Sequence, residues 1–227
     1  MVSRISIIIP AYNEEKSIGL VLKALPQRII HEIIVVDNNS TDDTARVALE
    51  HGARVVKEPR QGYGSACLRG IKELDAPDIV VFLDGDFSDF PEEIVSLIAP
   101  IEKNDEDFVL GSRMILPQSQ LALLPQARYG NRLAVFLIKL FFNHSYTDLG
   151  PFRAIRYDSL MAIGMQDTNF GWTVEMQIKA VKNKLRIIEI PVNYRQRVGV
   201  SKITGTISGT FQAGTKIIYT ILKYLIV

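Results

Sequence analysis

Hydrophobic residues in the first half of the chain form short continuous runs, separated by segments in which apolar residues recur three or four positions apart. The continuous runs are rich in Ile and Val and predict buried strands at 4–10, 32–37, 53–58 and 78–84. The periodic segments predict helices at 14–25, 40–52 and 62–74, and a further helix that begins at Pro91. This alternation predicts an α/β fold, with a mostly parallel sheet flanked by helices on both faces.

The pattern is less regular in the second half. Strands are predicted at 107–113 and 186–195, with a short strand or loop at 149–156. Helices are predicted at 125–142 and 171–183, and a last helical stretch runs from 206 to 227. Ser40 and Asp43 have the spacing of a capping box at the start of the 40–52 helix. With 227 residues, the chain has the size of one α/β domain with a substantial core.

The composition argues against several classes of protein. Lys and Arg total 26 against 25 Asp and Glu, a balance that argues against bulk nucleic-acid binding. The single cysteine, Cys67, excludes an internal disulfide and fits a reducing compartment such as the cytosol. The apolar run from Ile5 to Ile9 is too short for a signal peptide, and no run reaches the roughly eighteen apolar residues of a membrane span.

Two carboxylates, Asp84 and Asp86, stand where a predicted strand ends in the segment VVFLDGDFSDFPEEI. Such a pair can ligate Mg2+ or Mn2+ together with the phosphate oxygens of a substrate. An isolated triplet of this kind is more often an acidic turn that caps the next helix. Asp37, however, ends another predicted strand, and the carboxyl ends of parallel strands meet at one edge of a sheet. We therefore expect these carboxylates to line a common ligand-binding crevice.

Two further segments belong to this expected crevice. A carboxylate at a strand end, such as Asp37, often hydrogen-bonds a nucleoside, although it can also end the strand with an Asx turn. Arg60, Gly62 and Gly64 precede a predicted helix, and the glycines would let a phosphate approach the backbone closely. The alternative for this segment is an ordinary flexible loop.

Five segments occur in the order and spacing of family-2 glycosyltransferases with the GT-A fold: SIIIPAYNEE, VVDNNSTDDT, RQGYGSACLRGI, FLDGDFSDFPEEI and GSR. The chain resembles this family closely over residues 1–115 and less closely to residue 204. The resemblance implies a GT-A type, Rossmann-like sheet in which Asp37 contacts the nucleotide base. It also implies that Asp84 and Asp86 are catalytic and bind the metal and the diphosphate of a nucleotide sugar. The implied nucleotide-sugar contacts are Pro10, Tyr12, Glu14, Asp37, Arg60, Gly64, Asp84, Gly85 and Asp86.

The second half resembles one branch of the family, the dolichyl- and polyprenyl-phosphate sugar transferases. The segments TDLGPFRAIR and IPVNYRQRVGVSKIT carry this resemblance. The implied acceptor contacts are Arg113, Arg128, Asp148, Arg153, Arg197, Ser201 and Lys202. Asn38 departs from the pattern, because many relatives have a second Asp there, and Asp89 stands where some have His. Pro151 replaces a serine expected to hold the acceptor phosphate. This change affects the inferred identity of the acceptor more than that of the donor.

Two acceptor chemistries remain open at this point. A phosphate acceptor is already anionic and needs cations, which the arginines of the acceptor set would supply. A hydroxyl acceptor on a lipid or saccharide needs a general base, and Glu175 stands where relatives carry an acidic residue near the reaction centre. Glu175 can equally be an exposed or salt-bridged helix carboxylate, and any single arginine can be an ordinary solvated residue.

Two helical segments combine apolar and basic residues. Arg128, Arg132 and Lys139 share one stripe of the 125–142 helix. In the tail, the polar face is expected to carry Ser208, Gln212, Lys216, Thr220 and Lys223. Helices of this design can lie at a bilayer interface, or they can pack on the core or in a dimer. We expect a peripheral protein at the cytoplasmic face of a membrane, with an anchoring partner subunit or a homo-oligomer as further options.

These inferences combine into one functional prediction. We expect a single GT-A domain over 1–205, with a nucleotide-sugar half at 1–115 and an acceptor half at 116–205, followed by an amphipathic helix at 206–227. The resemblance implies an inverting, metal-dependent hexosyltransferase that moves a sugar from a nucleotide-diphospho-sugar to polyprenyl or dolichyl phosphate. A sugar-nucleotide pyrophosphorylase would open on a Gly-rich loop, which IIIPAYNEE lacks. A binding module without turnover is disfavoured by the intact Asp37, Asp84 and Asp86.

Overall fold

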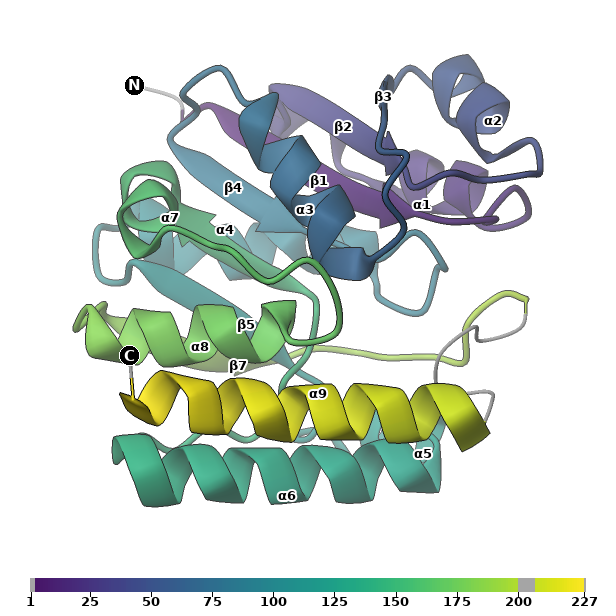
Figure 1. Ribbon diagram of the computed structural model, residues 1–227. Coiled ribbons are helices and arrows are strands. Elements are labelled where there is room, and N and C mark those ends of the chain that lie inside the picture. Colours follow the sequence, from purple (N-terminus) through teal and green to yellow (C-terminus); the bar gives the residue numbers. More distant parts are fainter. Residues whose placement is uncertain (1–2, 200–206, 227) are drawn as a thin grey trace.

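The computed structural model describes residues 3–199 and 207–226, which form a layered α/β structure (Figure 1). The strands of this part form one sheet in the order β3 (Arg54–Lys57), β2 (Glu32–Asp37), β1 (Ile5–Ala11), β4 (Ile79–Phe82), β6 (Arg153–Arg156), β5 (Phe108–Ser112) and β7 (Ile187–Pro191). β6 runs antiparallel to both of its neighbours, and every other pair is parallel. The mostly parallel sheet predicted from the continuous apolar runs is confirmed.

Helices cover both faces of the sheet, because alternate side chains of each strand reach opposite faces. On one face, Ile7 and Ile9 share a buried cluster with side chains of α1 (Ile18–Ala24), α2 (Thr44–Glu50) and α4 (Ile94–Glu102). On the other face, Ile8 shares a cluster with side chains of α3 (Tyr63–Lys72), α7 (Tyr157–Ile163) and α8 (Trp172–Lys182). Burial on both faces explains why the central strands are apolar at every position.

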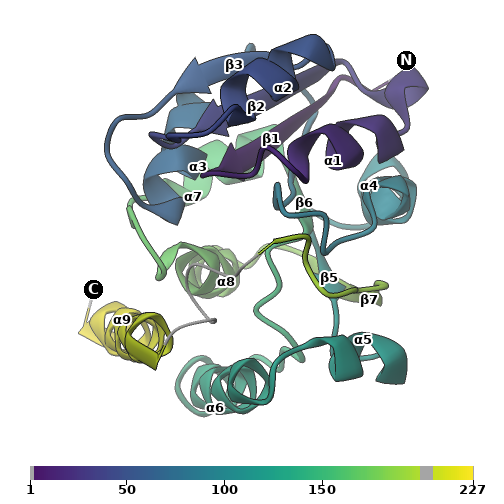
Figure 2. The same ribbon diagram turned by 90° about the vertical axis from the view of Figure 1, so that its right-hand side faces the viewer.

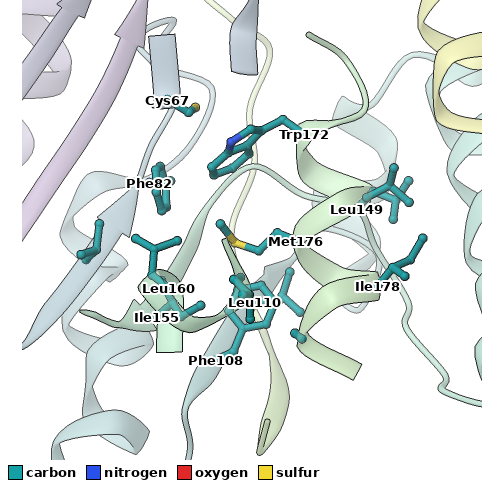
Figure 3. Packing of buried hydrophobic residues seen from close by; sticks show 14 of the residues in the cluster. Cys67, Phe82, Phe108, Leu110, Leu149, Ile155, Leu160, Trp172, Met176 and Ile178 are labelled. Atoms are coloured by element: carbon teal, nitrogen blue, oxygen red, sulfur yellow. The ribbon is translucent and has the colours of Figure 1, made fainter. Parts of the chain in front are cut away.

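The aromatic packing of the second face fixes the elements that later form the site. Trp172 is fully buried and meets the ring of Phe82 edge-on, with the ring centroids 4.6 Å apart (Figure 3). The centroid of the Tyr63 ring lies 5.9 Å from that of Trp172. Because Phe82 ends β4 and Tyr63 begins α3, this packing brings the end of β4 and the start of α3 together.

Two long helices form a further layer outside α8. α6 (Pro125–Phe142) and α9 (Ile207–Ile226) contact each other, and both contact α8 (Figures 1 and 2). Ile138 of α6 and Ile221 of α9 are fully buried in the cluster that also contains α8. α6 has its predicted bounds, with Pro125 at its first turn and Asn143 in the left-handed conformation at its end. In the described ranges, no helix is both long and apolar enough to cross a membrane.

Three local predictions differ from the structure. α2 begins only at Thr44, and the predicted capping box is wrong, because Ser40 Oγ instead accepts a hydrogen bond from Asn13 N at 3.0 Å. The 149–156 segment becomes a strand only from Arg153 onward. The sequence prediction lacks α5 (Pro117–Ala122) and α7, since each covers less than two turns and shows no clear periodicity. Short 3-10 turns lie at Gln27–Ile29 and Pro91–Glu93, the latter directly before α4.

Candidate active site

The carboxyl ends of β1 and β4 border the point at which the strand order of the sheet reverses. β2 and β3 follow on one side of β1, whereas β4 lies on its other side. Ala11 pairs with Asp37 and Ile8 pairs with Phe82, so the residues after Phe82 lie level with the end of β1. A Cβ atom at Gly85 would lie 3.4 Å from the Pro10 carbonyl oxygen. The predicted carboxylates therefore share one edge of the sheet, at the place where ligands bind in sheets of this type.

Three carboxylates cluster after β4, and two of them have few partners. Asp84 accepts a hydrogen bond from Tyr63 Oη at 3.1 Å. Burial, and then the charge of Asp86, raise the pKa of Asp84 to about 7. Asp89 is 1% exposed, and neither carboxylate oxygen has a hydrogen-bond partner among the described residues. Burial, followed by the charges of Asp84 and Asp86, raises the pKa of Asp89 well above its usual range. The surroundings thus supply too few cations and hydrogen-bond donors for all three carboxyl groups to ionise together near neutral pH.

Asp86 has the most partners of the three. Its Oδ1 accepts hydrogen bonds from Ser88 N at 2.9 Å and from Ser88 Oγ at 2.5 Å. Its Oδ2 lies 3.3 Å from Nη1 of Arg197, whose Nη2 lies 2.5 Å from Glu14 Oε1. Glu14 follows β1, and Arg197 comes from the segment after β7. Arg197, predicted as an acceptor contact, therefore reaches across the crevice to two residues predicted to contact the donor.

The sequence analysis missed Arg195, which closes the loop after β4 onto the same segment. Its guanidinium lies over the rings of Phe87 and Phe90, at 3.6 Å and 4.1 Å from their centroids. It also donates hydrogen bonds to the carbonyl oxygens of Phe87 and Asp89, at 2.7 Å and 3.0 Å. The alternation Arg-Gln-Arg was the available signal, because residues two apart on an extended segment point to the same side. Arg195 binds the backbone of the loop after β4, whereas Arg197 contacts the carboxylate of Asp86.

Asp37 and the segment after β1 lie beside each other. Asp37 is 7% exposed, and its Oδ1 accepts a hydrogen bond from Ser40 N at 3.0 Å, a local turn contact of the kind expected if Asp37 ends the strand. Glu14 N donates to Thr44 Oγ1 at 2.7 Å, which ties the end of β1 to the start of α2. Tyr12 is half-buried between these contacts and the end of β1. The predicted base-binding corner is thus braced by backbone hydrogen bonds.

The glycines before α3 serve a packing role that the sequence prediction did not foresee. A Cβ at Gly62 would lie 2.3 Å from the Thr168 carbonyl oxygen, and one at Gly64 would lie 2.1 Å from the Asp167 carbonyl oxygen. The bare sides of both glycines therefore meet the backbone that precedes α8. Arg60 is exposed beside them, with Nη2 3.4 Å from Thr168 Oγ1. The close approach of the 167–168 backbone is sufficient to explain why these positions are glycine, and a bound phosphate is not needed for that explanation.

Asp84 and Asp86 are the residues here that could hold a divalent cation. Carboxylate oxygens are the hard ligands that Mg2+ and Mn2+ prefer, and the raised pKa of Asp84 indicates a site short of positive charge. Within the described ranges, no group of three or more His, Cys, Asp or Glu side chains is arranged as a metal site. Two carboxylates therefore fit a cation whose remaining ligands come from the phosphates of a substrate.

Arg113 and Asp148, both predicted as acceptor contacts, form a buried ion pair. Nε and Nη2 of Arg113 donate to the two oxygens of Asp148 at 2.8 Å and 2.9 Å, and Arg113 N donates at 2.9 Å. Burial opposes ionisation of Asp148, but the charge and hydrogen bonds of Arg113 outweigh it and hold the pKa of Asp148 below its usual value. The guanidinium of Arg113 also lies 5.1 Å from the ring centroid of Tyr194. Asp148 positions Arg113 at the side of the crevice.

Arg153 does not reach the crevice as the sequence prediction expected. It is 0% exposed and donates to the carbonyl oxygens of Thr173, at 3.0 Å, and of Leu149 and Gly150. Its guanidinium lies between the rings of Phe108 and Trp172, and burial lowers the pKa of Arg153 to about 10. A cation enclosed in this way holds the backbone before β6 and cannot meet an acceptor without a rearrangement of the core.

Glu175 is also placed differently from the predicted general base. It is 0% exposed, and its oxygens accept hydrogen bonds from Asp167 N at 2.6 Å and from Tyr224 Oη at 2.6 Å. Gln166 N donates to it as well, and Lys179 Nζ forms an ion pair with it at 2.8 Å. The alternative that Glu175 is a salt-bridged helix carboxylate therefore describes it better. It joins α8, α9 and the 166–167 segment.

Arg128, Ser201 and Lys202 are the remaining members of the predicted acceptor set. Arg128 is half-buried in the first turns of α6. Pro151 is half-buried before β6. Ser201 and Lys202 lie outside the described residues. Arg113 and Arg197 are thus the members of the acceptor set that the structure brings to the acidic cluster.

Comparison with known proteins gives three relevant similarities. The pattern that defines glycosyl transferase family 2 matches residues 6–164. An uncharacterised glycosyltransferase of Mycobacterium bovis is 36% identical over 210 residues, which cover 92% of this chain and 94% of that protein. A dolichyl-phosphate hexose transferase of Haloferax volcanii is 32% identical, over 88% of this chain and 86% of that protein.

A solved structure shows the same fold. It is glucosyl-3-phosphoglycerate synthase of Mycobacterium tuberculosis in complex with Mn2+, UDP and phosphoglyceric acid, with a TM-score of 0.80 and 22% sequence identity. The match covers 98% of this chain and 78% of that one. At this level of identity the similarity establishes the fold, and it confirms the predicted α/β architecture of GT-A type.

Proposed function

The chain belongs to glycosyl transferase family 2 and is a glycosyltransferase, and from this premise we propose that it moves a sugar from a nucleotide-diphospho-sugar to polyprenyl or dolichyl phosphate at a membrane surface. The family membership confirms the resemblance inferred from the five motifs. The observation that carries the proposal is the under-compensated carboxylate cluster at the reversal point of the sheet, which Arg197 reaches from the acceptor half.

The donor would lie across the ends of β1, β2 and β4. Asp37 would contact the nucleotide base, and Arg60 and the start of α3 would lie beside the diphosphate. Asp84 and Asp86 would hold Mg2+ or Mn2+, and such a cation, when bound, neutralises the departing diphosphate. The Mn2+ and UDP in the fold relative named above support this assignment. An acceptor oxygen that attacks the anomeric carbon opposite the diphosphate inverts the configuration in a single displacement.

A phosphate acceptor fits the described residues better than a hydroxyl acceptor. A hydroxyl needs a base within hydrogen-bond reach of its proton, and Glu175, the candidate for that role, is enclosed by α8, α9 and the 166–167 segment. A phosphate monoester needs cations; Arg197 contacts Asp86, and the charge of Arg113 acts on Asp84 and Asp89. The dolichyl-phosphate hexose transferase of Haloferax volcanii, named for such an acceptor, supports the same choice.

The α6–α9 layer supports a membrane-bound acceptor. On α6, Leu133, Phe136 and Leu140 are exposed on one face, together with Arg132 and Lys139. On α9, the neighbouring exposed side chains are Phe211 (72%), Tyr219 (60%), Leu222 (45%) and Leu225 (43%). The two helices lie side by side at the edge of the molecule (Figure 1). Large apolar side chains flanked by basic ones can enter a bilayer interface and attract anionic lipids.

An acceptor assay tests the chemistry of the proposal. Radiolabelled UDP- and GDP-sugars are supplied with Mn2+ and either a polyprenyl phosphate or the corresponding polyprenol. We expect transfer to the phosphate alone, a product that mild acid cleaves, and loss of transfer in excess chelator. Transfer to the polyprenol or to a saccharide alone would overturn the phosphate acceptor. Turnover that persists in chelator would overturn the metal-assisted donor site.

A flotation assay tests the membrane surface separately. We expect the wild-type protein to float with anionic vesicles and the Phe136→Asp, Leu140→Asp double variant to stay in the aqueous fraction. Leu49→Asp is the matched control, because Leu49 is 60% exposed on α2, away from the α6–α9 layer. Unchanged flotation of the double variant contradicts the membrane surface. Dissociation of a dimer by the double variant, without any flotation of the wild type, would assign the surface to self-association.

A further inference from the structure

Asn38, the residue that departs from the common Asp, makes three side-chain hydrogen bonds to the loop before α3. Its Nδ2 donates to the carbonyl oxygens of Glu58 and Arg60, at 3.0 Å and 2.8 Å. Its Oδ1 accepts from Gly62 N at 2.8 Å. Asn38 is 6% exposed, and its own backbone N donates to the Ala11 carbonyl oxygen at 2.8 Å. Asn38 thus ties the end of β1, through its backbone, to the 58–62 loop, through its side chain.

Only an amide matches this set of partners. The amide nitrogen has two N–H donors for the two carbonyls, and the amide oxygen accepts from the backbone N–H. A carboxylate in the same place accepts from Gly62 but presents a charged oxygen to the carbonyls of Glu58 and Arg60. The two carbonyls then lose their donor and face a negative charge at a part-buried site, which is costly because neither partner is satisfied.

The loop held by Asn38 leads directly to residues of the donor site. Tyr63 follows Gly62, and its hydroxyl donates to Asp84 Oδ1 at 3.1 Å. On its other side the loop packs on Thr168, whose carbonyl oxygen accepts hydrogen bonds from Ser65 N at 2.9 Å and Ser65 Oγ at 3.1 Å. The loop is therefore fixed between the Asn38 amide and the Thr168 backbone. Asn38 is the contact that joins it to the strand ends carrying Asp37.

We propose that Asn38 is a positioning residue for the donor: its amide holds the 58–62 loop so that Arg60 and the start of α3 face Asp37 and Asp84. The inference rests on the donor site of the proposed function and adds a residue to it. Asn38 acts on the donor through the loop. Its substitution therefore weakens nucleotide binding without removing any ligand of the metal.

The test compares Asn38→Asp with Asn39→Asp. Both variants introduce the same charge one residue apart, but Asn39 is exposed. Its backbone is left-handed, with φ 66°, a conformation that Asn and Asp both tolerate. The probes are UDP and GDP, titrated calorimetrically in the presence of Mn2+. We expect Asn38→Asp to weaken binding of the preferred nucleotide by about tenfold or more, and Asn39→Asp to change it less than about threefold.

A pH series distinguishes positioning from general damage. When the carboxylate introduced by Asn38→Asp is protonated, it can donate to one carbonyl, so the ratio of the variant to the wild-type dissociation constant falls from about pH 8 to about pH 6. Asp84 is present in all three proteins, so the ratio removes the pH effects that they share. Equal binding by Asn38→Asp and wild type, equal effects of the two variants, or a ratio independent of pH would overturn the proposal.

Hydrogen exchange of the Gly62 amide provides a readout without nucleotide. Asn38→Ala removes the three contacts without adding charge, and we expect the Gly62 amide to exchange at least about tenfold faster while amides of β5 stay protected. If the Gly62 amide of Asn38→Ala exchanges at the wild-type rate, the proposal is contradicted. This test does not depend on whether Asn38→Asp folds. If the wild type binds neither UDP nor GDP, the donor assignment fails. The exchange result then decides separately whether Asn38 holds the loop.

Discussion

Two groups of buried charge in this molecule differ in how fully they are neutralised. At the end of β4, Asp84 has one hydrogen-bond donor among the described residues, and Asp89 has none. Beneath the acceptor half, Asp148 meets the bidentate guanidinium of Arg113, and Glu175 meets an ammonium group, a phenol and backbone N–H groups. Asp84 is half-buried and Asp89 is 1% exposed, compared with 1% for Asp148 and 0% for Glu175. The two groups differ in whether the protein supplies the partners itself.

The difference separates a binding role from a structural one. Burying a carboxylate is costly unless partners stabilise its charge, so an under-compensated cluster indicates that a cation or another ligand completes it. A carboxylate whose partners all come from the protein already contributes to the fold and has no free lone pair for chemistry. On this reasoning we assign Asp84 and Asp86 to the proposed site, whereas Asp148 and Glu175 hold the elements around it.

The largest expected effect of a substitution falls on turnover at Asp86. Asp86→Asn keeps both hydrogen bonds from Ser88 but removes the charge that would hold a divalent cation. We expect transfer to fall about a thousandfold or more, measured with labelled donor at saturating Mn2+, with a smaller loss of stability than in Asp148→Asn, because Arg197 keeps its ion pair with Glu14. Normal turnover of Asp86→Asn would show that the cluster is a structural turn and would break the comparison.

The next effect is on stability, at Asp148. Asp148→Asn places an amide N–H group against the guanidinium of Arg113 and leaves a buried cation without its partner. We expect a loss of about 3–5 kcal/mol in the free energy of unfolding, measured in denaturant. Asp43→Asn is the control, because the Asp43–Arg46 pair is exposed to solvent and is expected to contribute no measurable stability. Equal stability of the two variants would contradict a structural role for Asp148.

Glu175→Gln gives a smaller loss and separates two roles. The amide retains one acceptor oxygen for the 166–167 backbone but loses the ion pair with Lys179. A positioning role predicts a loss of about 1–3 kcal/mol of stability, with kcat per folded molecule within about threefold of wild type. A general base predicts the reverse: unchanged stability and a kcat lower by about a hundredfold or more. Glu102→Gln, exposed on α4, controls for the chemical change.

The sequence predicted the elements of the first half well because their physical causes are local. Continuous apolar runs identify the central strands, and in the second half a comparable local signal, Pro125, identifies the start of α6. The partners of the glycine loop were not predictable, because Thr168 is more than a hundred residues from Gly62 in sequence and the pairing arises only in the fold. Glu175 and Arg153 show the same limit. Their residue types fit catalysis, and only the fold reveals that both side chains are buried and hydrogen-bonded within the protein.

The effect expected at Asp84 is similar in size to that at Glu175 and has an unusual sign. Asp84 has a pKa of about 7 in the folded protein and about 4 when unfolded, so its ionisation favours the unfolded chain. The destabilisation is absent below about pH 4, grows as pH rises to about 7, and then stays constant. Asp84→Asn removes it, so the variant should be more stable than wild type at about pH 8, on the order of 2 kcal/mol, and no more stable at about pH 4.

Thermal unfolding in chelator at both pH values measures this difference, and repetition with Mn2+ sharpens it. Bound cation stabilises the charged wild-type cluster in proportion to occupancy, so Mn2+ should raise the Tm of wild type and leave that of Asp84→Asn nearly unchanged. With Mn2+ at about pH 8, the stability advantage of Asp84→Asn over wild type should therefore shrink or reverse. If Asp84→Asn is instead less stable than wild type in chelator, the protein already compensates Asp84. The carboxylates after β4 would then resemble the Asp148–Arg113 pair. A lack of partners would no longer distinguish a binding site from structural carboxylates.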